Sequence, residues 1–240
     1  MNTTMNWKSF ISFCIKHPLS LPKTIWFNFH YLPFRQAIKM PIFCYKIRLR
    51  KSKGEVVIDT DNIKTGMIRL GNDIVGIYPN DGVTWENAGK VVFRGRARFG
   101  NNCSVCVGRN GTLDLGDEFV ANAAIKIVCA YSIRFLYNVT IGWETLLMDT
   151  SFHRMKGLDG KFKGKGYGEI VLGKNNWLGA KCTVFPGAKT PDYCVVGAGS
   201  FLNKDISDWT THIMVAGNPV QIKVKDVWRD ANDDAPEIGF

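Results

Sequence analysis

The chain has 240 residues, which is enough for one large domain or two small ones with a substantial hydrophobic core. A hydrophobic content of 45% and 24 glycines fit a soluble, turn-rich β protein. The formal net charge of +10 predicts attraction to anions, either a phosphorylated ligand or an anionic bilayer surface. Nucleic acid is not an expected partner, because no recognised binding motif accompanies the charge.

The seven cysteines are an odd number without disulfide spacing. Cys103 and Cys106 form an isolated C-x-x-C, and no second pair completes a zinc site. We therefore expect buried thiols and no metal. The cytoplasm is the expected compartment, because no signal peptide is apparent and no apolar run approaches the ~20 residues of a membrane span.

Residues 1–55 differ from the rest of the chain. Four prolines, between Pro18 and Pro41, separate short aromatic and basic segments, and proline prevents long helices. We expect this region to cap an open end of the fold. Aromatic rings beside lysine and arginine also suit contact with the inner face of a membrane, and the two roles can coexist.

Residues 56–224 read as short strands. One register of apolar residues, six apart, runs from Leu115 to Val139, and a second one runs from Phe135 to His153. The two registers differ by two residues, which predicts a bulge or a small insertion near residues 133–139.

Two basic segments accompany the strands. Arg94, Arg96 and Arg98 alternate, which on a strand places them on one face that is either exposed or directed at a phosphate. Residues 154–169 are rich in glycine and lysine and interrupt the repeat. We expect them to form a loop extruded from the fold.

The repeat is clearest between residues 172 and 202. Every sixth residue there is apolar apart from one threonine: Leu172, Leu178, Val184, Thr190, Val196 and Leu202. A helix repeats its apolar face every 3.6 residues and an ordinary strand every 2, so a period of six fits neither. It fits a coil of short, flat strands whose neighbouring turns bury each other. Beyond it, residues 219–224 read as a strand, and 225–240 as a short helix and an acidic tail.

An ordered series of segments accompanies the repeat: Leu172-Gly-Lys-Asn-Asn-Trp-Leu-Gly-Ala180, Pro186-Gly187, Val195-Val-Gly-Ala-Gly-Ser200, Lys204-Asp205 and Ala216-Gly-Asn-Pro219. In these segments the chain resembles the hexapeptide-repeat acyltransferases, and the sugar and polysaccharide O-acetyltransferases most of all. It implies a mainly β fold, a left-handed parallel β-helix with an N-terminal irregular or helical cap and a short C-terminal strand–helix tail. It also implies acetyl-CoA as co-substrate and a homotrimer.

The resemblance extends to the catalytic base. Acyl transfer needs a group that takes the acceptor's proton, and histidine has an ordinary pKa near 6.5. His153 ends a stretch, Ile141-Gly-Trp-Glu-Thr-Leu-Leu-Met-Asp-Thr-Ser-Phe-His153, that looks like the family segment ending in the catalytic histidine. Several relatives carry an acidic residue two positions before it, where this chain has Ser151. Asp149 or Glu144 could orient the imidazole instead, or either could be a surface carboxylate.

Further site residues follow from the resemblance. Asn122 is similar to an acceptor-contacting asparagine, although it could equally satisfy its own corner, and Trp143 could stack on a sugar ring. The positions that match the acyl-CoA site are Trp177, Gly179, Ala180, Gly197, Ala198, Asn203 and Lys204.

Together these features predict an acyl-CoA-dependent O-acetyltransferase that acts on a sugar hydroxyl of a cell-surface glycan or its precursor. Two alternatives remain open from the sequence. One is N-acetylation of an amino sugar, which needs the same base, and the other is a β-helix that serves as a non-catalytic scaffold.

Overall fold

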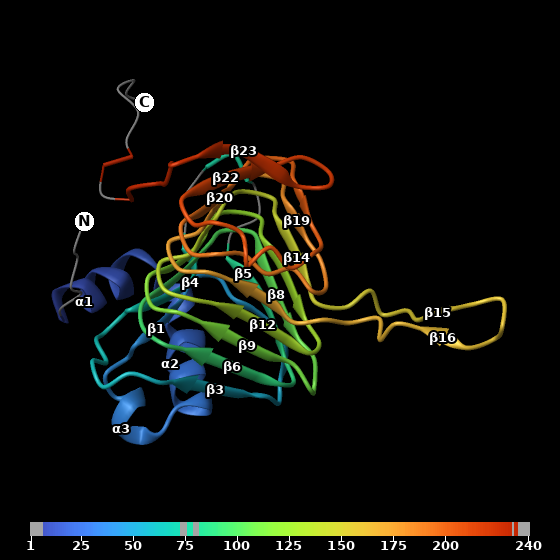
Figure 1. The fold of residues 1–240 in the computed structure, drawn as a ribbon. Coiled ribbons are helices and arrows are strands. Elements are labelled where there is room, and N and C mark those ends of the chain that lie inside the picture. Colours follow the sequence, from blue (N-terminus) through green and yellow to red (C-terminus); the bar gives the residue numbers. More distant parts are fainter. Residues whose placement is uncertain (1–6, 73–75, 79–81, 232, 235–240) are drawn as a thin grey trace.

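A computed structural model describes residues 7–72, 76–78, 82–231 and 233–234 (Figure 1). Three sheets wind around one hydrophobic core, and the chain visits them in turn as sheets A, B and C. Sheet A contains β1 (Ile42–Cys44), β4 (Ile68–Asn72), β7 (Ala97–Gly100), β10 (Phe119–Ala121), β13 (Thr140–Ile141), β18 (Trp177–Leu178), β20 (Cys194–Val196), β22 (Ile213–Ala216) and β23 (Gln221–Lys225). Sheet B contains β2 (Arg48–Ser52), β5 (Val83–Asn87), β8 (Cys103–Val107), β11 (Lys126–Cys129), β14 (Leu146–Met148), β19 (Thr183–Val184) and β21 (Phe201–Leu202). Sheet C contains β3 (Glu55–Ile58), β6 (Lys90–Phe93), β9 (Thr112–Leu115), β12 (Ser132–Phe135) and β17 (Ile170–Leu172).

The predicted six-residue period is the period of the coil. Leu178 on sheet A pairs in parallel with Val196, and Val184 on sheet B pairs with Leu202, eighteen residues further on in both cases. All four side chains are buried. A turn of three short strands therefore takes three times six residues, and each sixth side chain points inward. The predicted mainly β fold, a parallel β-helix, is confirmed.

The first half of the coil has wider turns. Leu115 on sheet C pairs with Phe135, twenty residues on, and β12 buries both Ile133 and Phe135. The expected bulge is therefore wrong, and the alternative of a small insertion fits, because this turn is two residues longer than the eighteen-residue turn from Leu178 to Val196. The sheet C strands are longer here, and two alternate residues of one strand both face inward. The extra room holds aromatic rings, since Phe119 contacts Phe99 and Phe135 with centroids 5.3 and 4.7 Å apart.

Four helical segments precede and cover the first turn, as predicted for a cap. They are α1 (Trp7–Lys16), η1 (Pro18–Ser20), α2 (Leu21–Tyr31) and α3 (Phe34–Ala37). Two buried side chains of α2 occupy the open edge of β1. The Asn28 amide donates a hydrogen bond to the Ile42 carbonyl at 2.7 Å and accepts one from the Ile42 N–H at 3.1 Å. The Thr24 hydroxyl makes hydrogen bonds with the carbonyl and the N–H of Cys44. Helix α2 thus closes the end strand of sheet A. The coil itself begins at β1 and so includes residues that the sequence analysis placed in the cap.

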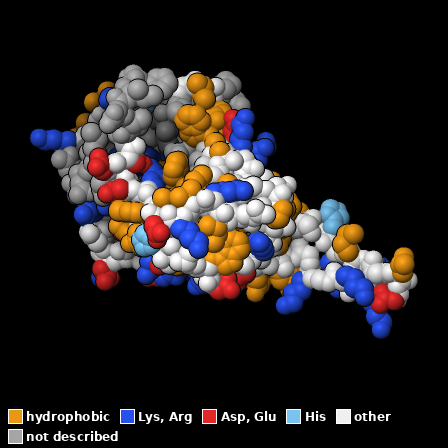
Figure 2. All heavy atoms as spheres, turned by 45° about the horizontal axis from the view of Figure 1, so that its top comes forward, with side chains coloured by type: hydrophobic (Ala, Val, Ile, Leu, Met, Phe, Trp, Pro, Cys, Tyr) orange, Lys and Arg blue, Asp and Glu red, His pale blue; other side chains and the backbone are white. Residues whose placement is uncertain are grey.

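The extruded loop is a hairpin of β15 (Met155–Lys156) and β16 (Phe162–Lys163), which projects far from the coil in Figure 1. Its basic and apolar side chains lie together in Figure 2, and the Arg154 guanidinium sits 3.7 Å from the Phe162 ring centroid.

The helix predicted at residues 225–230 is wrong. Strand β23 runs antiparallel to β22 as far as Lys225, and the chain then continues without a helix through Asp230. Six residues are too few for a stable isolated helix. The side chains pack on the coil instead, with the Trp228 ring 5.9 Å from the Tyr193 ring.

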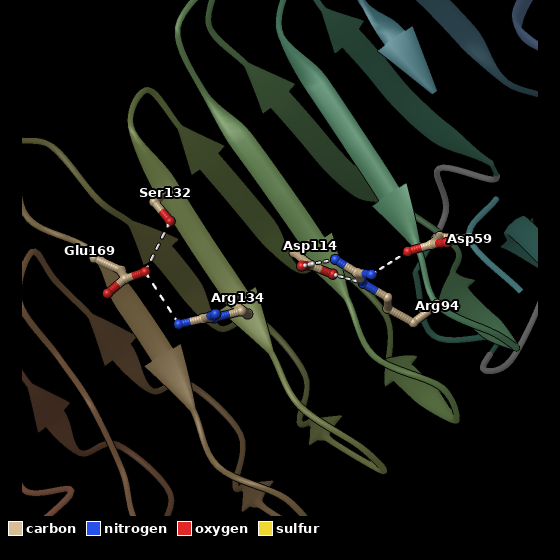
Figure 3. Close-up of polar contacts among 6 residues, drawn as sticks. All are labelled: Asp59, Arg94, Asp114, Ser132, Arg134 and Glu169. Carbon is tan, nitrogen blue, oxygen red and sulfur yellow. Dashed lines mark hydrogen bonds and ion pairs between the residues drawn. The ribbon is translucent and has the colours of Figure 1, made fainter. Parts of the chain in front are cut away.

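Ion pairs connect successive turns across the outer face of sheet C (Figure 3). Arg94 bridges Asp59 and Asp114, and Arg134 lies 3.6 Å from Glu169. Arg96 pairs with Glu118. Arg94 and Arg96 lie at the corner after β6, where their partners are carboxylates of neighbouring turns.

Candidate active site

His153 stands where the hairpin leaves the coil, between β14 of sheet B and β17 of sheet C. Turns that join sheet B to sheet C form what we call the BC edge. The neck of the hairpin is fixed by the antiparallel bridge of Thr150 with Tyr167 and by a 3.0 Å hydrogen bond from the Ser151 N–H to the Gly166 carbonyl. A Cβ on Gly166, whose φ is +75°, would lie 2.5 Å from the His153 carbonyl oxygen. Glycine at 166 therefore allows the neck to close against His153.

The imidazole of His153 is held by the backbone. Its Nδ1 lies 2.7 Å from the Ser151 carbonyl oxygen, which can only accept a hydrogen bond. Nδ1 of the neutral ring must therefore carry the proton, and Nε2 keeps its lone pair. The residue is exposed, so Nε2 can reach an acceptor hydroxyl.

Asp149, which the sequence analysis considered as the group that orients His153, makes its hydrogen bonds to the backbone of another turn. Its buried carboxylate accepts hydrogen bonds from the backbone N–H groups of Ala130, Tyr131 and Ser132, at 2.8, 2.8 and 2.7 Å. These three residues form the corner of the preceding turn. Burial, and next the Asp149 charge, raise the pKa of the adjacent Cys129 thiol. Asp149 thus ties two turns together, and the orienting group of His153 is the Ser151 carbonyl.

Glu144 is also engaged elsewhere. Its carboxylate accepts a 2.8 Å hydrogen bond from the Tyr78 hydroxyl and lies 3.7 Å from the Lys181 amine. It belongs to the turn between β13 of sheet A and β14 of sheet B. Such turns form the AB edge.

Most of the predicted acyl-CoA residues lie on the AB edge. Gly179 and Ala180 follow β18, and Gly197 and Ala198 follow the paired strand β20 at the same positions one turn on. A Cβ on Gly179 would lie 2.7 Å from the Ala198 nitrogen, so glycine lets these turns approach. The edge is consequently a narrow ledge of small residues.

Trp143, Asn122 and Trp177 flank this ledge. The Trp143 indole is 40% exposed, and its carbonyl accepts a hydrogen bond from the Lys181 N–H at 2.7 Å. Within the described residues, the Asn122 side-chain amide makes no hydrogen bond, so it does not satisfy its own corner and can meet a ligand. Trp177, at the start of β18, lies under the Arg229 guanidinium, 5.2 Å from its ring centroid.

Asn203 and Lys204 follow β21 and so lie on the BC edge, the edge of His153. The Lys204 amine stands 4.9 Å above the Trp209 ring. Strand β14 of sheet B separates the two edges. The chain runs along it from Glu144 to Thr150, and six extended residues span roughly 20 Å. The structure therefore places His153 and the small-residue ledge on opposite sides of sheet B in one chain.

A basic depression of about 520 Å³ lies further along the BC edge, against α2. Its lining includes His30, Lys53, Lys90 and Arg109. Lys90 is paired with Glu55 at 3.4 Å. Nothing in the local sequence signalled this depression, because its residues come from α2 and three separate turns. No group of three or more potential metal ligands occurs in the described parts of the chain.

Sequence comparison relates the chain to sugar acetyltransferases. It is 30% identical to the galactoside O-acetyltransferase of Escherichia coli over 114 residues, which are 46% of this chain and 52% of that protein. It is 31% identical to the galactoside O-acetyltransferase of Lactococcus lactis over 111 residues, 46% and 51% of the two chains. The chain thus spans about half the length of these curated relatives. No family model matches it.

The similar solved structures include the acetyltransferase NeuO, specific for polysialic acid, with a TM-score of 0.46 and 16% identity over 80% of this chain and 92% of that one. Another is a galactoside acetyltransferase in complex with coenzyme A, with a TM-score of 0.39 and 16% identity over 95% and 88%. The chain is thus similar in sequence, over a little under half of its residues, to galactoside O-acetyltransferases, in agreement with the resemblance found in its repeat.

Proposed function

We propose that this protein transfers the acetyl group of acetyl-CoA to a sugar hydroxyl of a cell-surface glycan or its precursor. The observation that carries the proposal is the hydrogen bond that fixes the orientation and tautomer of the His153 imidazole. Its Nδ1 is held at 2.7 Å by a carbonyl, so the free Nε2 is exposed beside the hairpin of a coil related to galactoside O-acetyltransferases.

The chemistry requires one proton transfer and one bond exchange. Nε2 of His153 takes the proton of the acceptor hydroxyl as its oxygen attacks the thioester carbon. The tetrahedral intermediate then expels the CoA thiolate, and the imidazolium returns the proton to that sulfur. The products are an acetyl ester and CoA, and no covalent enzyme intermediate is needed.

The division of the site between two edges supports an assembly in which copies complete each other. Sheet B lies between the edges, and its outer face presents Val128, Leu146, Met148 and Phe201, all only partly buried in the single chain. If this face turns toward a three-fold axis, the BC edge of one copy meets the AB edge of the next. His153 of one chain would then face the small-residue ledge of its neighbour. A homotrimer provides this arrangement.

Within that site, the ledge at Gly179, Ala180, Gly197 and Ala198 would hold the pantetheine arm, with Trp177 at its side, and Asn203 and Lys204 would hold other parts of acetyl-CoA. Asn122 and Trp143 would contact the acceptor. A cytoplasmic location would supply the acetyl-CoA.

The test is thiol release from acetyl-CoA with a panel of sugars, amino sugars and nucleotide sugars. The expected result is turnover with a hydroxyl acceptor and a loss of about 10² or more in kcat for His153→Ala. His212→Ala is the matched control, because His212 is a partly exposed histidine whose ring stacks on Tyr193, with centroids 4.3 Å apart. It should retain full activity. Turnover only with amino sugars would indicate N-acetylation, and equal activity of the wild type and His153→Ala would remove the base from the proposal.

A mixing experiment tests the shared site. His153→Ala is one inactive partner, and Ala198→Trp, which blocks the exposed ledge, is the other. Chains unfolded together and refolded in equal amounts should recover about a quarter of wild-type activity, the fraction of interfaces that pair an intact base with an intact ledge. No recovery, with correctly assembled mixtures, would show that each chain builds its own site.

A further inference from the structure

The net positive charge of this protein arises from its N-terminal region. Residues 1–53 contain ten lysines and arginines and no aspartate or glutamate. The net charge of the whole chain is also +10, so the residues from 54 to 240 are neutral as a set. The net charge is therefore a property of the helical cap and the first two strands, and the rest of the coil adds none.

The same helices expose large apolar side chains. On α2, Ile25, Trp26 and Phe29 lie opposite the buried face that contacts β1, and they are 42%, 41% and 47% exposed. Phe34 of α3 is 71% exposed, and its ring centroid lies 6.1 Å from that of Phe29. Ile38 continues the series at 47%. Together these five residues form what we call the cap patch.

The neighbouring helix α1 adds apolar residues of its own. Ile11 and Ile15, one helical turn apart, are 56% and 75% exposed, and Leu19 in η1 is 90% exposed. Apolar surface that stays in water forgoes a free energy of burial of about 25 cal/mol per Å². A group of exposed apolar side chains of this size therefore indicates an interaction surface.

We propose that the cap docks the enzyme on an anionic lipid bilayer, with the cap patch inserted at headgroup depth and the surrounding cations over the lipid phosphates. Indole and phenyl rings favour that depth, and each cation near an anionic surface adds to the attraction. Arg35 and Lys39 stand beside the patch in sequence, both are exposed, and neither has a partner among the described residues. No described helix is long and apolar enough to cross a membrane, so the contact is a peripheral one.

The charge distribution argues against a second copy of the cap as the occupant. Two caps in contact would bring five lysines and arginines of residues 1–41 against five, with no acidic side chain in either segment to offset them. An anionic bilayer supplies both the apolar layer and the opposite charge.

The test is flotation of the full chain with vesicles of phosphatidylcholine alone or with 30% phosphatidylserine, at low and high salt. We expect binding to the anionic vesicles only, weakened by salt. Phe29→Ser with Phe34→Ser should lower the partition coefficient about tenfold per ring. Arg35→Gln with Lys39→Gln should lower it about fivefold per charge.

The hairpin and the coil provide matched controls. Phe162→Ser replaces an equally exposed ring in the hairpin, and Lys126→Gln with Lys174→Gln removes two exposed cations from the coil. These should bind like the wild type, and this binding result does not depend on the proposed acetyl transfer. If the transfer is correct, all variants should also keep the wild-type rate on a soluble acceptor. No binding to anionic vesicles at low salt would overturn the proposal. Equal losses in the cap and control variants would overturn it as well, as would self-association through Phe34 without vesicle binding.

Discussion

The Asp149 carboxylate offers the sharpest test of how this site is built. The side chain is fully buried and accepts three backbone N–H groups, at 2.7 to 2.8 Å, from the corner at residues 130–132. Asp149→Ala leaves three buried donors without a partner, and each orphan costs about 1–3 kcal/mol. Allowing for partial relaxation, we expect a loss of roughly 3–6 kcal/mol, a large share of the ~5–15 kcal/mol of a typical domain. Asp149→Asn keeps one oxygen and should cost about 2–4 kcal/mol.

The measurement is urea denaturation at one protein concentration, because an assembled protein gains stability from association. A loss of 2–4 kcal/mol should lower the midpoint by about 1 M. The matched control is Asp159→Asn, whose exposed carboxylate pairs with Lys163 at 3.3 Å in the hairpin. It should change stability by less than about 0.5 kcal/mol.

Activity separates the two roles of the carboxylate. Where Asp149→Asn remains folded, the pH profile of kcat/KM should match that of the wild type, because His153 is oriented by the Ser151 carbonyl. An unchanged midpoint combined with a loss of 10² or more in kcat would refute this reasoning, since it would show that the carboxylate serves the base.

Two further predictions concern the neck and the thiols. Gly166→Ala adds a Cβ 2.5 Å from the His153 carbonyl at a φ of +75°, so it should lower kcat at least tenfold with a midpoint shift of less than about 0.5 M, measured by turnover and urea denaturation. Burial raises the pKa of Cys103 and Cys194 to about 12, so their thiolates form only at very alkaline pH and make up about one part in 10⁴ at pH 8. We expect at most two of the seven thiols, Cys14 and Cys106, to react quickly with a chromogenic disulfide at pH 8, and all seven in denaturant. A third fast thiol would mean that the coil opens.

The coil was predictable because its rule is local and repeats. A side chain that points inward at every sixth residue, from Leu172 to Leu202, leaves the same mark in the sequence turn after turn. The wider first half was not predictable in the same way. There β12 buries both Ile133 and Phe135, and from sequence alone an extra inward residue looks the same as a bulge.

The site was only partly accessible from the sequence. His153 could be singled out as the candidate base because it directly precedes a segment that breaks the repeat. The task of Asp149 was missed because its partners are backbone N–H groups of another turn, which carry no residue signature. The position of the small-residue ledge across sheet B from His153 depends on which corner each turn occupies, and this follows from the strand order alone.

The change in width along the coil means that its turns are not interchangeable. Removing eighteen residues between Leu178 and Val196 would join two positions that already pair, and so would leave every inward side chain in register. The same cut after Leu115 would end two residues short of Phe135, so the following strands and corners would pair two residues out of register. The narrow end can therefore gain or lose whole turns over evolutionary time, whereas the wide end, where the rings of Phe99, Phe119 and Phe135 pack together, must be kept as one block.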